Sequence, residues 1–391
     1  MTLSRFAFPT TIHFGPGAAK LVGPHLAEQR VKRPLVVTDR ALAKLPLAIG
    51  FVAELRKSGL DVAVYDGVFG NPTASQANGG GAAFRAHHAD GVVGLGGGAA
   101  LDVAKIVGVL GTAGGDAIEY AWDHPKVRPI PDAIPYFVAL PTTAGTGSEV
   151  GRSAVVSEDD THVKRIVFSP KILARQVFAD PELTLGLPAG VTAATGMDAL
   201  THNVESYLSP AYHPLCDGIA LEGARIAARA LPTAVHEGSN LAARGDMLMA
   251  SMMGAIAFQK DLGAVHSCAH ALSTVADLHH GLANGVMIDH VMGFNLPSAT
   301  GKMAELARVC GAKGGDIGST ESRAAAFLIW LKDLKAVVGV PAKLSGLSGS
   351  RPVTRADLPR LVEVAFADLC HQTNPRPCSQ SDFEALFASA L

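Results

Sequence analysis

Short apolar runs alternate with segments of helical periodicity through the first part of the chain, and this alternation constrains the fold most strongly. Four runs are almost continuously apolar, at residues 34–38, 61–65, 91–95 and 136–140. Such runs are typical of strands in a parallel sheet that helices cover on both faces. We therefore expect an α/β fold, with a helix over residues 41–58. The helix expected after the second strand is weakened by the Asn-Gly-Gly-Gly sequence at 78–81.

The chain changes character near residue 182. Beyond it the strand-like runs vanish, and long segments rich in Ala, Leu and Met, such as 214–231 and 241–258, have helical periodicity. The length of 391 residues fits two or three domains at roughly 150 residues each. We therefore expect an α/β domain of the nucleotide-binding type over residues 1–182 and an all-helical domain over residues 183–391.

The composition excludes several classes of protein. Hydrophobic residues make up 48% of the chain and charged residues 17%, which is too apolar and too weakly charged for a disordered chain. The formal net charge of −2 gives no electrostatic footprint for nucleic acid or an anionic membrane. Five cysteines in so long a chain form no disulfide framework, so a reduced, cytoplasmic compartment fits best.

No targeting or membrane segment is expected. The first residues, MTLSRFAFPTTIHF, lack the basic start, the apolar core and the small-residue cleavage site of a signal peptide. The longest apolar stretches are broken by Gly, Asp or Lys before the roughly 18 residues that a membrane span needs. We therefore expect no membrane among the partners of this chain.

Two glycine-rich loops follow expected strands. Residues 94–102, GLGGGAALD, join the third strand to a helix, where backbone N–H groups and the helix dipole favour an anion. Residues 141–149, PTTAGTGSE, follow the fourth strand, at the sheet edge where open α/β folds bind ligands. Either loop could instead be an ordinary connection that satisfies its own backbone.

Asp39 ends the first strand. A carboxylate at this position can bind an adenosine ribose and repel a 2′-phosphate, which favours NAD over NADP. It can also cap the helix that begins near Arg40, and the two roles are compatible.

Histidines cluster in the helical part of the chain. Four fall within fifteen residues, at His266, His270, His279 and His280. His266 and His270 are four residues apart, as are Asp198 and His202, so each pair can share one helix face. Three imidazoles and one carboxylate suit Fe²⁺ or Zn²⁺ and leave a coordination position for a substrate oxygen. Either pair alone is also explained as ordinary core or surface residues.

Several of these motifs together resemble the iron-containing (group III) alcohol dehydrogenase family. They are GGGAALDVAK at 96–105, PTTAGTGSEV at 141–150, DPELTLGLP at 180–188, and the spaced Asp and His residues. The resemblance spans nearly the whole chain. It implies a Rossmann-like dinucleotide-binding domain over residues 1–182 and an all-helical metal-binding domain over residues 183–391.

The resemblance also implies a set of site residues. The metal ligands would be Asp198, His202, His266 and His280, and the family spacing of fourteen residues selects His280 over His279. His270 matches a histidine that is not a ligand and is a candidate proton relay. The cofactor-binding residues would be Asp39, Gly97, Gly98, Ala99, Asp102, Thr142, Thr143, Thr146 and Lys164.

The implied reaction is hydride transfer between a small primary alcohol and NAD, with Fe²⁺ or Zn²⁺ polarising the substrate oxygen. Several stretches look closer to 4-hydroxybutyrate dehydrogenases, which predicts a short hydroxy acid as substrate. Its carboxylate needs a cationic or multi-donor partner, and Arg152 or His371 could serve. Ser153 and Cys370 are further candidates, while Arg152 could equally form an ordinary ion pair.

Three departures from the family pattern bear on the substrate. The segment 273–279 directly before His280 lacks the aromatic residue common in the family, Ala99 replaces a common Ser, and Gly151-Arg152 stands where Thr is common. A general short-chain alcohol dehydrogenase is therefore an alternative. A lyase similar to dehydroquinate synthase, with a catalytic NAD, and a non-catalytic nucleotide-binding protein are more distant ones. The resemblance suggests a homodimer or larger homo-oligomer.

Overall fold

The computed structural model describes residue 8 and residues 10–347 and 351–391. Most of the N-terminal stretch whose composition argued against a signal peptide lies outside these residues. The chain forms two compact units. The α/β unit comprises residues 8–143 and 147–184. The helical unit comprises residues 144–146 and 185–391 among those described, so it includes part of the second glycine-rich loop.

A six-stranded parallel sheet forms the centre of the α/β unit, as the apolar runs predicted. In spatial order its strands are β1 Thr11–Phe14, β8 Gln176–Ala179, β5 Tyr136–Pro141, β4 Gly91–Gly96, β2 Pro34–Asp39 and β3 Ala63–Val68. Four of them match the expected runs within three residues. The sequence analysis missed β1 and β8, because four-residue strands are too short to show periodicity.

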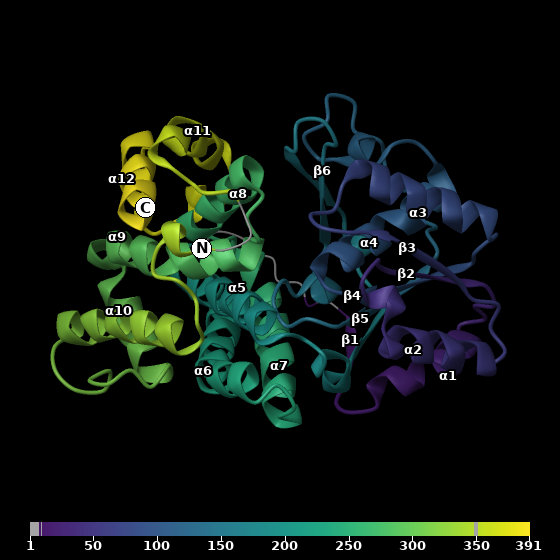
Figure 1. Ribbon diagram of the computed structural model, residues 1–391, viewed down its shortest axis with the longest axis horizontal. Helices are drawn as coiled ribbons and strands as arrows, with labels where there is room; N and C mark the ends of the chain where they lie inside the picture. The colour runs from purple at the N-terminus through teal and green to yellow at the C-terminus, as the bar shows by residue number, and fades with distance from the viewer. Residues whose placement is uncertain (1–7, 9, 348–350) are drawn as a thin grey trace. The chain divides into compact units, whose positions relative to one another are not determined.

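Helices cover both faces of this sheet (Figure 1). Helices α1 Val22–Glu28 and α2 Pro46–Lys57 lie on one side, and α3 Ala74–Ala86 and α4 Gly98–Ala113 on the other. The first side is a buried apolar layer in which Val36 and Val93 of the strands pack with Phe51 of α2. Helix α4 begins directly after β4, and its N-terminus lies where a nucleotide phosphate would bind.

The glycine-rich segment 78–81, which weakened the helix prediction, lies inside α3. A Cβ atom on Gly80 would lie 2.4 Å from Val107 Cγ2, and one on Gly81 would lie 2.6 Å from Leu110 Cβ. These glycines lower the intrinsic stability of the helix but allow α3 to pack closely on α4. Tertiary packing therefore outweighs helix propensity in this segment.

The helix expected over residues 41–58 is shorter in the structure. Helix α2 begins only at Pro46, which occupies its first turn, and residues 42–44 form a separate 3₁₀ turn. Asp39 Oδ1 accepts hydrogen bonds from the backbone N–H groups of Ala41 and Leu42, at 3.0 and 2.9 Å, and stabilises this turn. The sequence analysis also missed an antiparallel hairpin, formed by β6 Ser153–Ser157 and β7 Lys164–Phe168.

The helical unit is built around a central helix, α5. Its helices are α5 Ala189–Leu208, α6 Pro214–His236, α7 Leu241–Ala257, α8 Ala264–Ala276, α9 His280–Val309, α10 Thr320–Val337, α11 Leu358–Ala367 and α12 Gln380–Ala390. Helix α5 packs against α6, α7 and α9, and residues 196–208 are buried without a break. The polar side chains of α5 are therefore held in the interior, where they need partners.

One helical segment, Leu241–Lys260, is long and apolar enough to cross a membrane by length and composition, with a mean hydropathy of 1.2. Arg244, Gly245 and Asp246 interrupt it, as expected for the longest apolar stretches of this chain. In addition, 61% of its most apolar 18-residue window is buried inside the protein, and core helices pass the same test. This single segment is weak evidence for a membrane span.

Candidate functional site

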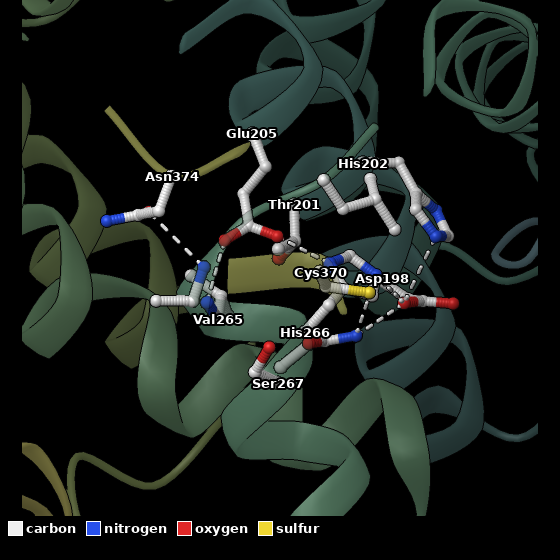
Figure 2. A network of polar contacts seen from close by, with 12 residues as sticks. Asp198, Thr201, His202, Glu205, Val265, His266, Ser267, Cys370 and Asn374 are labelled. Atoms are coloured by element: carbon white, nitrogen blue, oxygen red, sulfur yellow. Dashed lines mark hydrogen bonds and ion pairs between the residues drawn. The ribbon is translucent and has the colours of Figure 1, made fainter. Parts of the chain in front are cut away.

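Three histidine side chains converge in the helical unit on one carboxylate oxygen of Asp198. Asp198 and His202 lie one turn apart on α5, His266 lies near the start of α8, and His280 begins α9. The Nε2 atoms of His202, His266 and His280 lie 4.0, 3.7 and 3.6 Å from Asp198 Oδ1. Figure 2 shows Asp198, His202 and His266 pointing toward one another.

These distances fit a shared cation. Bonds of 2.0–2.1 Å to a tetrahedral ion place neighbouring N and O ligands about 3.3–3.5 Å apart. The observed separations exceed this range by a few tenths of an ångström, which small side-chain rotations would close. Asp198, His202 and His266 also form a metal-type group by the proximity of their ligand atoms. The residues present therefore fit Fe²⁺ or Zn²⁺.

The electrostatics favour ligand-competent protonation states at His202 and Asp198 but not at His266, whose pKa Asp198 and Glu205 raise to about 9 despite its burial. Burial lowers the pKa of His202 to about 4, although the charge of Asp198 opposes this shift. Burial would raise the pKa of Asp198, but the three histidines outweigh it and hold that pKa well below its usual range. A neutral imidazole and an ionised carboxylate are the forms that bind a metal.

Close packing of α9 on α5 places His280 beside Asp198. The next residue is Gly281, and a Cβ atom there would lie 2.4 Å from the carbonyl oxygen of Ala194. Only glycine allows α9 to begin this close to the α5 backbone. The neighbouring His279 instead accepts a hydrogen bond from the N–H of Leu282 as the N-cap of α9.

The sequence analysis missed Asn284. Its Nδ2 donates to Asp198 Oδ1 at 2.7 Å and lies 3.2 Å from His280 Nε2 and 3.4 Å from His266 Nε2. The partial positive charge of this amide lies among the atoms that would bind a cation. Its spacing of four residues from His280 on α9 is the signal that could have identified it.

The sequence analysis also missed Glu205, which contacts the back of a predicted ligand. Glu205 Oε2 lies 2.6 Å from His266 Nδ1, and Oε1 accepts the N–H of Val265 at 2.7 Å (Figure 2). Both side chains are 1% exposed. Because Nδ1 donates to the carboxylate, Nε2 is left as the ligand atom. Glu205 follows Asp198 by seven residues, which places it on the same face of α5.

His270 has a carboxylate partner that the sequence analysis did not identify. His270 Nδ1 lies 2.8 Å from Asp368 Oδ2, and its ring stacks on that of His280 with 5.1 Å between centroids. Asp368 Oδ1 also accepts from Ser267 Oγ and from the N–H of Cys370. No local pattern links His270 to Asp368, which follows 98 residues later.

The α/β unit has a cavity of about 470 Å³ beside the first glycine-rich loop. Its lining includes Asp39, Arg40, Lys44, Gly97 and Ala99. Gly97 is the N-cap of α4, and Gly98 is the first residue of that helix. The helix N-terminus and the strand ends therefore fit the pyrophosphate and ribose of a dinucleotide.

Asp102, predicted to bind the cofactor, has its carboxylate occupied by protein partners. Oδ1 accepts from Ser148 Oγ at 2.5 Å and lies 3.3 Å from Lys105 Nζ, and Oδ2 accepts the N–H of Val155. Lys105 Nζ also donates to Ser148 Oγ and to the carbonyl of Ser153. This buried network ties α4 to the 141–150 loop and to β6, so the Asp102 carboxylate holds the loop in place.

The other predicted residues are distributed over both units. The α/β unit holds Thr142, Thr143, Arg152, Ser153 and Lys164, and the helical unit holds Thr146, Cys370 and His371. The N–H of Thr142 donates to the carbonyl of Gly96, which links the two glycine-rich loops. Lys164 begins β7 opposite Ser157. His371 Nε2 contacts the carbonyl of Phe366 at 3.0 Å, so its ring is held against protein.

Glu149, in the second glycine-rich loop, makes the stability of the folded protein depend on pH. It is 2% exposed, and its Oε1 has no hydrogen-bond partner among the described residues. Burial raises the pKa of Glu149 to about 7, although Lys105 opposes the shift. The pKa of Glu149 is higher in the folded protein than in the unfolded chain. Its contribution to the free energy of unfolding is therefore fully present at low pH and is lost as the pH rises through about 7.

Replacing Glu149 with glutamine should therefore raise the melting temperature relative to the wild type above pH 7. The difference in melting temperature should shrink toward pH 5. The corresponding difference in the free energy of unfolding is at most about 3 kcal/mol. Thermal melts from pH 5 to 8 measure it. Glu54→Gln, an exposed change in the same unit, is the control and should show no such trend. A difference between Glu149→Gln and wild type that is constant with pH would contradict the assignment.

Comparisons with known proteins agree with this geometry. A family model described as iron-containing alcohol dehydrogenase matches residues 9–181, and the model of that family's C-terminal part matches residues 192–391. The chain is 37% identical to a 1,3-propanediol dehydrogenase of Citrobacter freundii over 389 residues, covering 99% of this chain and 98% of the relative. It is 36% identical to a 4-hydroxybutyrate dehydrogenase of Cupriavidus necator over 392 residues, covering 98% of each.

Solved structures show the same fold. The crystal structure of a 1,3-propanediol oxidoreductase superposes with a TM-score of 0.93 at 36% identity, over 100% of both chains. A sulfoacetaldehyde reductase from Bifidobacterium kashiwanohense, in complex with NAD⁺, superposes with a TM-score of 0.88 at 27% identity, over 100% of this chain and 99% of that one.

Proposed function

The chain belongs to the iron-containing alcohol dehydrogenase family, and from this premise we propose that it interconverts a small primary alcohol and its aldehyde by metal-dependent hydride transfer with NAD. The observation that carries the proposal is the convergence of three imidazole Nε2 atoms on Asp198 Oδ1 within 4.0 Å. This donor set suits Fe²⁺, and Zn²⁺ would also fit.

The residues of the chain divide the work of the reaction. When bound, the metal polarises the substrate oxygen and NAD accepts the hydride. Asp198, with the three histidines, holds the cation, and Glu205 orients His266. Because His270 Nδ1 contacts Asp368, its Nε2 is the basic atom that can take up the alcohol proton. Asp368 orients that ring.

NAD is the preferred cofactor in this proposal. Asp39 Oδ1 is used by the N–H groups of Ala41 and Leu42, and Oδ2 faces the position of Gly96 at the end of β4. A carboxylate oxygen there suits ribose hydroxyls and disfavours a 2′-phosphate. A homodimer or larger homo-oligomer and a cytoplasmic location are also part of the proposal, on the grounds of family resemblance and composition.

For the substrate we propose a short hydroxy acid such as 4-hydroxybutyrate. Its support is the similarity to a 4-hydroxybutyrate dehydrogenase and the cation Arg152 beside the 141–150 loop. Arg152 lies over the ring of Phe168 at 5.7 Å, and among the described residues no carboxylate lies within 4.0 Å of it. A general short-chain alcohol dehydrogenase is the second candidate, supported by similarity to a methanol dehydrogenase of Bacillus methanolicus at 34% identity.

The test of the reaction is metal analysis of anaerobically purified protein, combined with NADH absorbance over a panel of alcohols and hydroxy acids. We expect one metal ion per chain at the cluster, turnover with NAD, and a loss of turnover on chelation that Fe²⁺ restores. Full activity after complete metal removal would overturn the mechanism.

Replacing Arg152 with methionine tests the substrate. We expect KM for 4-hydroxybutyrate to rise about 10- to 100-fold, since a hydrogen bond to a charged group contributes about 1.5–3 kcal/mol. Activity on 1-butanol should change little. Arg128→Met, a surface change at an ion pair of the same unit, is the control. An equal loss on both substrates would contradict a carboxylate-binding role and favour the second candidate.

A further inference from the structure

A second cluster of metal-binding atoms lies outside the four-ligand set. It consists of His270 on α8, Asp368 directly after α11, and Cys370 at the start of the 3₁₀ turn Cys370–Thr373. Their ligand atoms lie within 4.8 Å of one another. All three residues are partly exposed, with the side chains of His270 and Asp368 at 22% and 20%. Ions in solution can therefore reach this cluster without unfolding of the helical unit.

We propose that His270, Asp368 and Cys370 form a second, inhibitory cation site that selects Zn²⁺. The donors are one imidazole nitrogen, one carboxylate oxygen and one thiolate. Zinc accepts this mixed set in tetrahedral geometry, with a water molecule in the fourth position. The thiolate separates this site from the first cluster, whose donors are only nitrogen and oxygen.

The geometry needs only local adjustment to hold an ion. A tetrahedral zinc ion with bonds of about 2.0–2.3 Å requires ligand atoms roughly 3.3–3.7 Å apart. Cys370 Sγ, which lies within 4.8 Å of the other two ligand atoms, must move closer to them. The distance of 2.8 Å between His270 Nδ1 and Asp368 Oδ2 must increase slightly. Asp368 is already held in place by Ser267 and by the N–H of Cys370, so it provides a fixed anchor.

The charges balance on binding. The Cys370 S–H bond breaks, its proton passes to solvent, and the thiolate lone pair forms the bond to zinc. The carboxylate of Asp368 supplies the second negative charge, so the dication is neutralised by its own ligands. The first cluster has a single carboxylate, Asp198, and so leaves its ion with a net positive charge.

Zinc at the second site would inhibit turnover without displacing the catalytic ion. It engages His270, the residue that would otherwise accept the alcohol proton. This consequence rests on the proposed dehydrogenase function, whereas binding itself does not. Two readouts of binding therefore accompany the readout of inhibition.

The experiment starts from protein that carries one equivalent of Fe²⁺, prepared without oxygen. Zn²⁺ alone is added, and both metals are counted by mass spectrometry after removal of unbound ions. In a parallel titration with Co²⁺, ligation by a thiolate produces a charge-transfer band in the near ultraviolet. The test variant is Cys370→Ser. The control is Cys310→Ser, a buried cysteine at the end of α9 whose Sγ donates to the carbonyl oxygen of Ala224.

We expect wild type and Cys310→Ser to bind one zinc ion while retaining iron, and to show the thiolate band with Co²⁺. Cys370→Ser should lose the band and bind zinc at least about 10-fold more weakly. Zinc inhibition, measured relative to each variant's own activity, should weaken in parallel. Displacement of iron without a second bound ion, or an unchanged band in Cys370→Ser, would overturn the site. Normal binding without inhibition would retain the site and refute the role of His270 in turnover.

Discussion

Replacing Asp198 with asparagine should abolish tight metal binding and lower kcat/KM for short alcohols by at least about 10³-fold, or about 4 kcal/mol of transition-state stabilisation. Asp198 is the only anion among the four predicted ligands, and its Oδ1 is the atom on which the three Nε2 atoms converge. A neutral amide removes the charge that offsets the dication in a site where Asp198, His202 and His266 are almost fully buried. Metal content and steady-state kinetics measure the two losses.

The control for this change is Asp246→Asn, which alters an exposed ion pair with Arg229 in the same helical unit. It should leave metal content and kcat/KM unchanged. A thermal melt shows whether Asp198→Asn is folded, and we expect it to be, because the variant buries less charge. Full metal content with unaltered kinetics in Asp198→Asn would show that the catalytic ion lies elsewhere.

The central strands of the sheet can be predicted from the local sequence pattern, but the edge strand β1 and the start of α2 cannot. Strand β4 is buried throughout and β5 from Phe137 onward, so their apolar runs identify them. Strand β1 reads Thr-Ile-His-Phe, with no residue fully buried, and offers no comparable contrast. The start of α2 depends on a turn capped by Asp39 and on Pro46, which periodicity does not detect.

The site divides in a similar way. Pairs within one helix, such as Asp198 and His202, can be recognised from a spacing of four residues. Their meeting with His266 and His280 depends on how α5, α8 and α9 pack, and the spacing alone left ordinary core histidines as an alternative. The carboxylate partner of His270, which is not one of the four ligands, is harder still to predict, because Asp368 shares no local pattern with it.

Glu205 is the partner whose loss should have the second-largest effect. Its two oxygens have separate tasks: Oε1 accepts the N–H of Val265, and Oε2 accepts the Nδ1 proton of His266. The N-cap of α8, Gly263, has no side chain to satisfy the first turn of that helix. A carboxylate from α5 therefore fixes both the start of α8 and the ring of the ligand it carries.

Replacing Glu205 with glutamine keeps the shape but disturbs this arrangement. If the amide oxygen continues to accept from Val265, the NH₂ group faces His266 Nδ1. That atom must then become an acceptor, which moves the ring proton to Nε2, the atom that faces Asp198. To bind the metal, His266 must then give up the proton on Nε2 and return to the less stable tautomer, which weakens binding. We expect the metal dissociation constant to rise about 10- to 100-fold, measured by competition with a chelator.

Saturating metal separates a positioning role from a general structural one. If Glu205 acts through His266, excess Fe²⁺ should restore most of kcat in Glu205→Gln, because the bound state regains the ligand geometry. Glu222→Gln, an exposed change on α6, is the matched control and should bind metal as tightly as the wild type. Wild-type metal affinity in Glu205→Gln would contradict the positioning role. A loss of kcat that no concentration of metal restores would also contradict it, because Glu205 would then act in a step other than metal binding.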